Sequence, residues 1–247
     1  DLHSFPTRRS SDLVVDDLIR GVAALQHRSV EEVIKVAGPS GQDLGVAYVE
    51  APVSGIVCGI DIETTDRDPS RGYIINIGIE FMRLTPTAKP EHPFSSYCGI
   101  PELYREKGVP LAFVHHISWD DLAGKKPLRQ HNKMQRAILA TLEMYPFMAH
   151  NASFEDSWFM MQIDGYAEAR KAGRITPIDT RDICRRIDPE YKTLPHDSKP
   201  ATLENWARRR GTLKANQKET HLGLEDVDLM FPTTRSEERR VGKECRS

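Results

Sequence analysis

The most informative pattern in the chain is a short apolar stretch, residues 57–60, that ends in two acidic residues. Its composition, Val-Cys-Gly-Ile, includes β-branched residues and is typical of a buried strand. Asp61 and Glu63 follow, with Ile62 between them. Because residues two apart on a strand share a face, both carboxylates should point the same way while Ile62 points into the core. Adjacent carboxylates repel each other unless a cation lies between them, and hard divalent cations prefer oxygen ligands.

An acid-x-acid triplet carries little weight alone. The chain has 36 acidic residues among 247, so such triplets occur by chance and most belong to the solvated surface. The position of this triplet on an apolar strand favours a site. That interpretation depends on further acids and a base at matching places downstream.

The apolar pattern predicts more strands and a covering helix. Residues 73–84 are dense in isoleucine and predict a second strand, residues 86–93 a turn, and residues 94–100 a third strand. With the acid-bearing strand in the centre, the three should form an antiparallel meander. Residues 130–145 have apolar positions at helical spacing and should pack on this sheet, and Ser118 is expected to cap a short helix.

A later strand leads into a second polar cluster. Residues 146–149 form a short apolar stretch that runs directly into His150, Asn151, Phe154 and Glu155, after which apolar residues continue as a helix. Ligands of open α/β sheets collect at the carboxyl ends of strands. This turn therefore predicts a second part of the site.

The last third of the chain contributes a histidine and another acid. Residues 177–180 start a short element, and residues 203–210 predict a helix that ends at Gly211. Its arginines, 208–210, should form a solvated face rather than a path for phosphates. His221 lies just before or at the start of a further helix that carries Asp226.

The two ends of the chain differ from the rest. Residues 1–13 and 235–247 lack an apolar period and resemble translated sequencing adapter. A DNA sequence that encodes the tail also encodes the head when its reverse complement is read one base over. A natural basic tail for nucleic acid is the alternative. If both ends are artefacts, the remaining residues carry 27 Lys and Arg and 31 Asp and Glu, a net charge of −4, and the natural protein is longer.

Residues 14–54 are expected to form a separate N-terminal part. Residues 14–37 show helical spacing and predict one or two helices, and residues 41–54 read as a linker with one short strand around 46–49. They show no chemistry, and their role stays open. The main domain is expected to span residues 55–234.

Composition excludes several classes of protein. Apolar residues make up 39% of the chain and charged residues 28%, which is typical of a soluble globular protein and not of a disordered one. No apolar run approaches the length of a membrane helix, so no membrane partner is expected. The cysteines are scattered, which favours a reduced, cytoplasmic compartment over a disulfide framework.

Taken together, three motifs resemble those of the DEDDh 3′–5′ exonuclease family, which includes the proofreading epsilon subunit of bacterial DNA polymerase III and ribonuclease T. They are Asp61-x-Glu63, the turn that begins His150-Asn151 and continues to Phe154 and an acid, and His221 followed by Asp226. The resemblance covers about residues 56–230. It implies an α/β, ribonuclease H-like fold with a mixed five-stranded sheet flanked by helices.

The resemblance also implies an activity: metal-dependent removal of nucleoside monophosphates from the 3′ end of single-stranded nucleic acid. Two divalent cations, Mg²⁺ or Mn²⁺, suit an oxygen-rich site and such hydrolysis. By resemblance His221 is the general base, and a histidine titrates near neutrality. The implied metal ligands are Asp61, Glu63, Glu155 and Asp226. The implied substrate contacts are Ile62, Thr64, Thr65, His150, Asn151, Phe154 and His221.

One position departs from the family. The residue after Phe154 is usually aspartate, but here it is Glu155, with Asp156 next. Glu155 occupies the position of the family's aspartate and should take its role. Its side chain is one methylene longer, so it reaches further but is positioned less precisely. Asp156 is the substitute, although successive helical residues point about 100° apart. His150 and Asn151 could instead orient the turn and satisfy its backbone.

Two functional alternatives follow. The protein is a 3′–5′ exonuclease, or it is a catalytically weakened nucleic-acid-binding or polymerase-associated module with the same fold. Convergence of the four acids and His221 on one point favours the enzyme. The sequence does not separate DNA from RNA, because the 2′-hydroxyl is read by local shape, and DNA is the working substrate.

Overall fold

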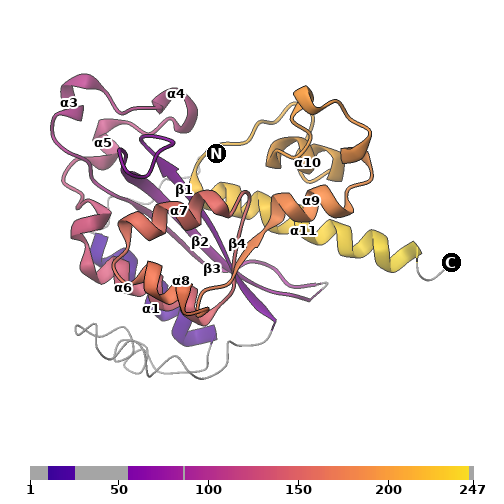
Figure 1. Cartoon of the computed structure of the whole chain (residues 1–247), viewed down its shortest axis with the longest axis horizontal. Coiled ribbons are helices and arrows are strands. Elements are labelled where there is room, and N and C mark those ends of the chain that lie inside the picture. Colours follow the sequence, from indigo (N-terminus) through magenta and orange to yellow (C-terminus); the bar gives the residue numbers. More distant parts are fainter. Residues whose placement is uncertain (1–10, 26–54, 86, 245–247) are drawn as a thin grey trace, which may run out of the picture.

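The computed structural model describes residues 11–25, 55–85 and 87–244 (Figure 1). In chain order the elements are α1 (Ser11–Leu25), β1 (Ile56–Thr64), β2 (Ile74–Arg83), β3 (Glu91–Tyr97), α3 (Tyr104–Lys107), α4 (Ala112–His115), α5 (Trp119–Leu122), α6 (Asn132–Met144), β4 (Phe147–Ala149), α7 (Ser153–Gln162), α8 (Tyr166–Lys171), β5 (Pro177–Asp179), α9 (Thr180–Ile187), α10 (Leu203–Arg210) and α11 (Gly223–Glu244), with 3₁₀ turns at Leu128–Gln130, Glu190–Lys192 and His196–Ser198.

The five strands form one mixed sheet in the order β3-β2-β1-β4-β5. β1, β2 and β3 are antiparallel neighbours, whereas β4 and β5 run parallel to β1. The predicted meander and the mixed five-stranded sheet are therefore confirmed. The acid-bearing strand β1 is central in the whole sheet, whereas β2 is the middle strand of the meander (Figure 1).

The two faces of the sheet are buried under different helices. Ile60 and Ile62 point into the main core, which α1, α6, α7 and α8 complete. Val57 points the other way and packs against Phe231 of α11 in a second core. Gly59 lies on this second face, where an added Cβ would come within 2.5 Å of the Phe231 ring, so α11 crosses β1 in direct contact. The alternation predicted for β1 is thereby confirmed.

Several predicted elements agree with the structure, and one has wrong bounds. The helix predicted over residues 130–145 is α6. The third strand runs from Glu91 to Tyr97 rather than from residue 94 to residue 100, so it begins within the segment predicted as a turn. β3 is an edge strand, so one of its sides has no neighbouring strand. A proline such as Pro93, which has no backbone N–H to donate, is tolerated there. The strand predicted at residues 46–49 lies outside the described residues.

Two predicted helix ends are also confirmed. The carboxylate of Asp121 accepts hydrogen bonds from the backbone N–H of Ser118 at 2.8 Å and from its hydroxyl at 2.7 Å, at the start of α5. α10 ends at Gly211, whose φ of 72° is the left-handed conformation that glycine adopts readily. Within the described residues, no helix is long and apolar enough to cross a membrane.

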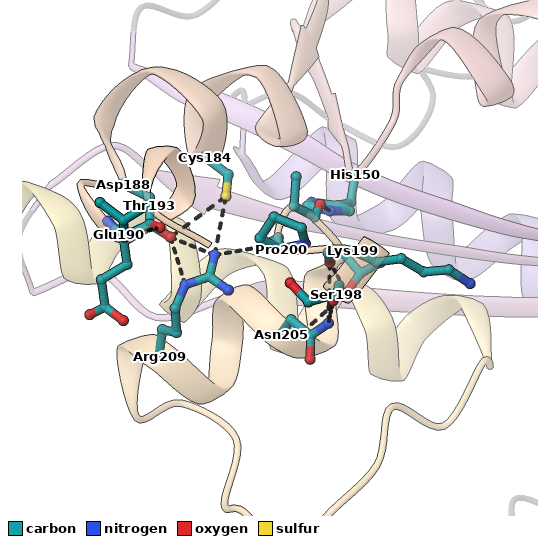
Figure 2. A network of polar contacts seen from close by, with 12 residues as sticks. His150, Cys184, Asp188, Glu190, Thr193, Ser198, Lys199, Pro200, Asn205 and Arg209 are labelled. Carbon is teal, nitrogen blue, oxygen red and sulfur yellow. Dashed lines mark hydrogen bonds and ion pairs between the residues drawn. The ribbon is translucent and has the colours of Figure 1, made fainter. Parts of the chain in front are cut away.

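A buried ion pair joins α9, α10 and the segment between them (Figure 2). The Arg209 guanidinium donates to Asp188 Oδ2 from Nε at 2.8 Å and from Nη2 at 2.5 Å, and also to the carbonyl oxygen of Pro200. The side chain of Asp188 is only 3% exposed. The expectation that arginines 208–210 form a solvated face is therefore wrong for Arg209, because its partner lies inside the protein.

Arg209→Ala should destabilise the protein strongly, because it leaves the buried Asp188 carboxylate without its cation. The expected loss in unfolding free energy is about 3–5 kcal/mol, measured by urea unfolding. Arg186→Ala, which removes an exposed arginine of α9, is the control and should cost no more than about 0.5 kcal/mol. Equal stability of the two variants would contradict this account.

Candidate active site

The site begins where β1 and β2 meet the start of α11. Asp61 pairs with Gly78 of β2. A Cβ on Gly78 would lie 2.1 Å from the backbone nitrogen of Leu224, so glycine is required for α11 to come this close. Asn76 then accepts a hydrogen bond from the backbone N–H of Gly223 at 3.1 Å. These contacts fix the first residues of α11 on the strands that carry the acids.

The same contacts bring His221 and Asp226 to the end of β1. His221 adopts a left-handed φ of 52° just ahead of α11, and Asp226 lies in the first turn of the helix, 4% exposed. His221 Nδ1 is 3.9 Å from Asp226 Oδ2. Possible ligand atoms of Glu63, His221 and Asp226 all lie within 4.8 Å of one another. The structure thus brings together residues predicted from the first and last motifs.

The carboxylates of this cluster repel one another. Loss of solvation raises the pKa of Asp61 well above its usual range, and the charges of Asp226, Glu155 and Glu63 raise it further. Loss of solvation, with the charges of Asp226 and Glu219, raises the pKa of Glu63 to about 9. The same cause, with Glu219 the leading neighbouring charge, raises the pKa of Asp226 to about 8. These shifts mark closely spaced acids.

Glu155 and Asp156 point to different surroundings. Glu155 is 2% exposed, and burial, followed by the charges of Asp179 and Glu63, raises its pKa to about 8 against the opposing effect of its own backbone N–H. Asp156 instead accepts hydrogen bonds from the Tyr166 hydroxyl at 2.7 Å and from Arg170 Nε at 3.0 Å. The first-turn acid that faces the cluster is therefore Glu155, while Asp156 joins α7 to α8.

Two acids near the site had no role in the sequence interpretation. Glu219 raises the pKa of Asp61, Glu63 and Asp226, and burial, then the charge of Glu204, raises its own pKa to about 7. Asp179 lies beside Glu155 at the end of β5. Only weak signals in the sequence point to them: Glu219 lies in a polar loop two residues before His221, and Asp179 ends a short strand.

His221 is suited to accept a proton. Its side chain is 42% exposed, so solvent and a substrate can reach it. Partial burial lowers its pKa, while the charge of Glu204 raises it and His116 lowers it. The imidazole is therefore neutral near neutral pH.

His150 makes contacts within the protein through both ring nitrogens. Nε2 lies 2.8 Å from the carbonyl oxygen of Ala201, Nδ1 lies 3.0 Å from the Thr180 hydroxyl, and the ring stacks on Trp206. Burial lowers its pKa to about 4, so the ring is neutral. In this arrangement His150 orients the turn after β4, the alternative to contact with substrate that the sequence left open.

Other predicted substrate contacts near β1 also have partners in the protein. Ile62 is 4% exposed in the main core. The Thr64 hydroxyl donates to the carbonyl oxygen of Asp66 at 2.7 Å, and the Thr65 hydroxyl accepts from the backbone N–H of Tyr73 at 2.9 Å. These side chains shape the loop after β1, and a role toward substrate stays a prediction.

In the turn after β4, Asn151 adopts a left-handed φ of 85°, which asparagine tolerates better than most residues. Its side-chain oxygen accepts a hydrogen bond from Arg181 Nη1 at 3.2 Å. Phe154 is partly buried against the main core, with its ring 6.0 Å from that of Trp158. Contact of either residue with a nucleotide stays a prediction.

The donor set suits a hard divalent cation. The cluster presents mainly carboxylate oxygens, which Mg²⁺ and Mn²⁺ prefer. Glu155 Oε2 is buried and has no hydrogen-bond partner among the described residues. A cation would provide that partner and relieve the repulsion among the acids. The residues present therefore fit a metal site.

Stability of the metal-free protein should fall as the pH rises. The folded-state pKa values of about 9 for Glu63 and about 8 for Glu155 and Asp226 lie above the unfolded value of about 4. Folding therefore takes up protons, and the associated stability, complete at low pH, is lost as the pH rises to about 9. Thermal unfolding with chelator should show the melting temperature falling between about pH 5.5 and 9, and Mg²⁺ should flatten this slope.

Glu80 supplies the control for this measurement. Burial and the neighbouring Asp228 raise its pKa to about 8, so it adds to the same slope. Glu80→Gln should reduce the slope yet keep the response to Mg²⁺, whereas the double variant Glu63→Gln, Asp226→Asn should lose that response. If Mg²⁺ leaves the pH dependence of the melting temperature unchanged in the unmodified protein, the carboxylates of the cluster do not bind the cation.

Comparison with known proteins identifies the fold. No family model and no curated protein matches the chain. A full-length 3′-exonuclease matches with a TM-score of 0.52 at 15% identity, covering 77% of this chain and 83% of that chain. A structure of exonuclease I matches with a TM-score of 0.57 at 16% identity, and E. coli exonuclease I in complex with a dA16 oligonucleotide with 0.54 at 16%.

Both exonuclease I matches cover 75% of this chain but only 41% of exonuclease I, so the chain spans about two fifths of that protein's length. At these identities the likeness shows the fold. It confirms the predicted α/β, ribonuclease H-like architecture with a mixed five-stranded sheet flanked by helices, which this chain shares with these exonuclease structures.

Proposed function

We propose that the chain is a metal-dependent 3′–5′ exonuclease of the DEDDh type, which releases nucleoside monophosphates from the 3′ end of single-stranded nucleic acid. The observation that carries the proposal is the convergence of His221 and Asp226, at the start of α11, on Glu63 and Asp61 at the end of β1. The shared fold supports it. The dA16 complex of exonuclease I makes single-stranded DNA the first substrate to test.

In this proposal Asp61, Glu63, Glu155 and Asp226 hold two divalent cations, Mg²⁺ or Mn²⁺. Such cations, when bound, stabilise the negative charge on the attacking and leaving oxygens of the phosphodiester. The four carboxylates come from β1, α7 and α11, so they surround the reacting phosphate from separate elements. Glu155 takes the third acidic position because it faces Glu63.

His221 acts as the general base. Its neutral imidazole accepts the proton of the attacking water, and its partial exposure lets that water reach the ring. Asp226, 3.9 Å from Nδ1, then stabilises the imidazolium ion. The proton acceptor thus comes from the residue just before α11, and its counter-charge comes from the first turn of that helix.

Hydrolysis can be tested with single-stranded oligonucleotides labelled at either end. With Mg²⁺ or Mn²⁺, the 5′-labelled strand should shorten stepwise, and the 3′-labelled strand should release its label first as a mononucleotide. Chelator should abolish both reactions, and Asp61→Asn should slow them at least about 1,000-fold, since it removes a charged side chain that would hold a cation. Asp68→Asn, in the exposed loop after β1, is the control and should keep activity.

Internal cleavage, shortening from the 5′ end, or full activity in the presence of chelator would each refute the proposal. The same assay on RNA decides which sugar is preferred. The polymerase partner and the cytoplasmic location stay predictions.

Paired variants test the assignment of the third acid. Glu155→Gln should lower kcat at least about 100-fold because it removes a charged ligand at nearly constant volume. Asp156→Asn weakens the contacts to Tyr166 and Arg170, so it should lower the melting temperature while keeping kcat within about threefold. Steady-state kinetics and thermal unfolding measure both, and the opposite pattern of activities would assign the role to Asp156.

The departure at Glu155 sustains one alternative, a weakened module that binds nucleic acid without cleaving it. The longer side chain costs geometric precision at a position where the family has aspartate. Tight binding of single-stranded DNA with no cleavage under any divalent cation would favour this alternative.

A further inference from the structure

The strands β4 and β5 end side by side, and each leads into a helix. They are parallel, with Ala149 paired to Asp179 at their last residues. After β4 a short turn leads into α7, which carries Glu155 in its first turn. After β5 the chain enters α9 directly, with Asp179 as the N-cap. The turn that precedes Glu155 and the cap of α9 therefore lie at one edge of the sheet.

The Asp179 carboxylate bonds to both elements. Its Oδ1 accepts from the backbone N–H of Arg181 at 2.9 Å, the usual bond of an N-cap, and also from the backbone N–H of Asn151 at 3.0 Å. Arg181 returns a bond, from Nη1 to the side-chain oxygen of Asn151 at 3.2 Å. These three residues, Asp179, Asn151 and Arg181, form a reciprocal set that we name the turn latch.

The turn latch determines how α7 begins. The carbonyl oxygen of Asn151 accepts from the backbone N–H of Phe154 at 2.8 Å, so the first turn of α7 starts from this residue. Glu155 follows, with its Oε2 buried and without a hydrogen-bond partner among the described residues. With no such partner to orient that oxygen, the direction of the Glu155 side chain depends on the position of the helix start.

A neutral N-cap residue on α9 would have avoided the repulsion between Asp179 and Glu155. Serine and asparagine cap helices about as well as aspartate does. Asp179 instead places another carboxylate beside Glu155, where like charges repel. A carboxylate bonds two N–H groups more strongly than a neutral oxygen does, and here the second bond crosses to the turn that carries Glu155. Capping α9 requires only the bond from the backbone N–H of Arg181. The bond from Asn151 is therefore not explained by the cap.

We propose that Asp179 is a positioning residue for Glu155, which it holds toward Glu63 and Asp61 through the backbone N–H of Asn151. The inference rests on the proposed function of the site. It assigns Asp179 no contact with substrate.

Three variants test it in the full chain: Asp179→Ala removes both bonds, Asp179→Asn keeps an acceptor oxygen, and Asp182→Ala removes an exposed carboxylate of the same helix, paired with Arg185. With single-stranded DNA, Asp179→Ala should lower kcat about 10- to 100-fold with KM within about threefold, since small displacements of catalytic groups cost about this much. Asp179→Asn keeps an acceptor oxygen but bonds the two N–H groups more weakly, so its kcat should fall between those of the unmodified protein and Asp179→Ala. Asp182→Ala should match the unmodified protein.

Two further readouts do not need hydrolysis. Mn²⁺ affinity, measured by electron paramagnetic resonance, should fall about tenfold in Asp179→Ala and stay unchanged in Asp182→Ala. Amide hydrogen exchange of residues 150–158 should speed up in Asp179→Ala alone. If Asp179→Ala fails to fold, Arg181→Ala removes only the returning bond and should lower kcat several-fold with faster exchange in the same segment.

The outcomes separate this inference from the proposed function. Normal hydrolysis, Mn²⁺ affinity and exchange in Asp179→Ala would overturn the turn latch and leave the exonuclease intact. A protein that cleaves nothing, yet loses Mn²⁺ affinity and exchange protection only in the Asp179 variants, would support the turn latch without the exonuclease. If the unmodified protein neither cleaves nor binds Mn²⁺, unchanged exchange in Asp179→Ala overturns the inference and faster exchange supports it.

Discussion

The close approach of α11 to the centre of the sheet is the constraint on which the site depends. Gly78 and Gly223 leave room for two backbones to touch, and Asn76 bonds the helix start to β2. A side chain at either glycine would move α11 away from β1. His221 and Asp226 would then no longer lie beside Glu63. The site therefore requires glycine at both positions.

Repulsion among the carboxylates is the opposing effect that this packing must withstand. The acids lie on β1, α7 and α11, and each element is held by a contact of its own: strand pairing, the turn latch and the glycine contacts. Apolar packing on both faces of the sheet stabilises the arrangement, because Val57 and Ile60 are buried under helices on opposite sides. A rigid frame around mutually repelling acids is pre-organised for a cation, since the ligands need little rearrangement on binding.

Local patterns in the sequence predicted much of this arrangement. The two-residue period places Asp61 and Glu63 on one face of β1 and Ile62 on the other, because strand geometry depends only on neighbouring residues. The positions of Glu219, Asp179 and Asn76 could not be predicted in the same way. Their roles come from contacts between segments far apart in the chain, and a polar residue in a loop or on a strand has no local period to mark it. The start of β3 was missed because Pro93 suggested a turn, and only the edge position of the strand makes that proline acceptable.

The glycine contacts between β2 and α11 also bear on the order in which the protein becomes complete during synthesis. β1 and its acids emerge from the ribosome before the residues that dock on Gly78, which belong to the start of α11. A nascent chain that still lacks α11 has an uncovered sheet face at Val57 and Gly59 and no histidine beside Glu63. The site therefore cannot assemble before α11 is made, so the strands that carry Asp61 and Glu63 can form before the histidine of the site is in place.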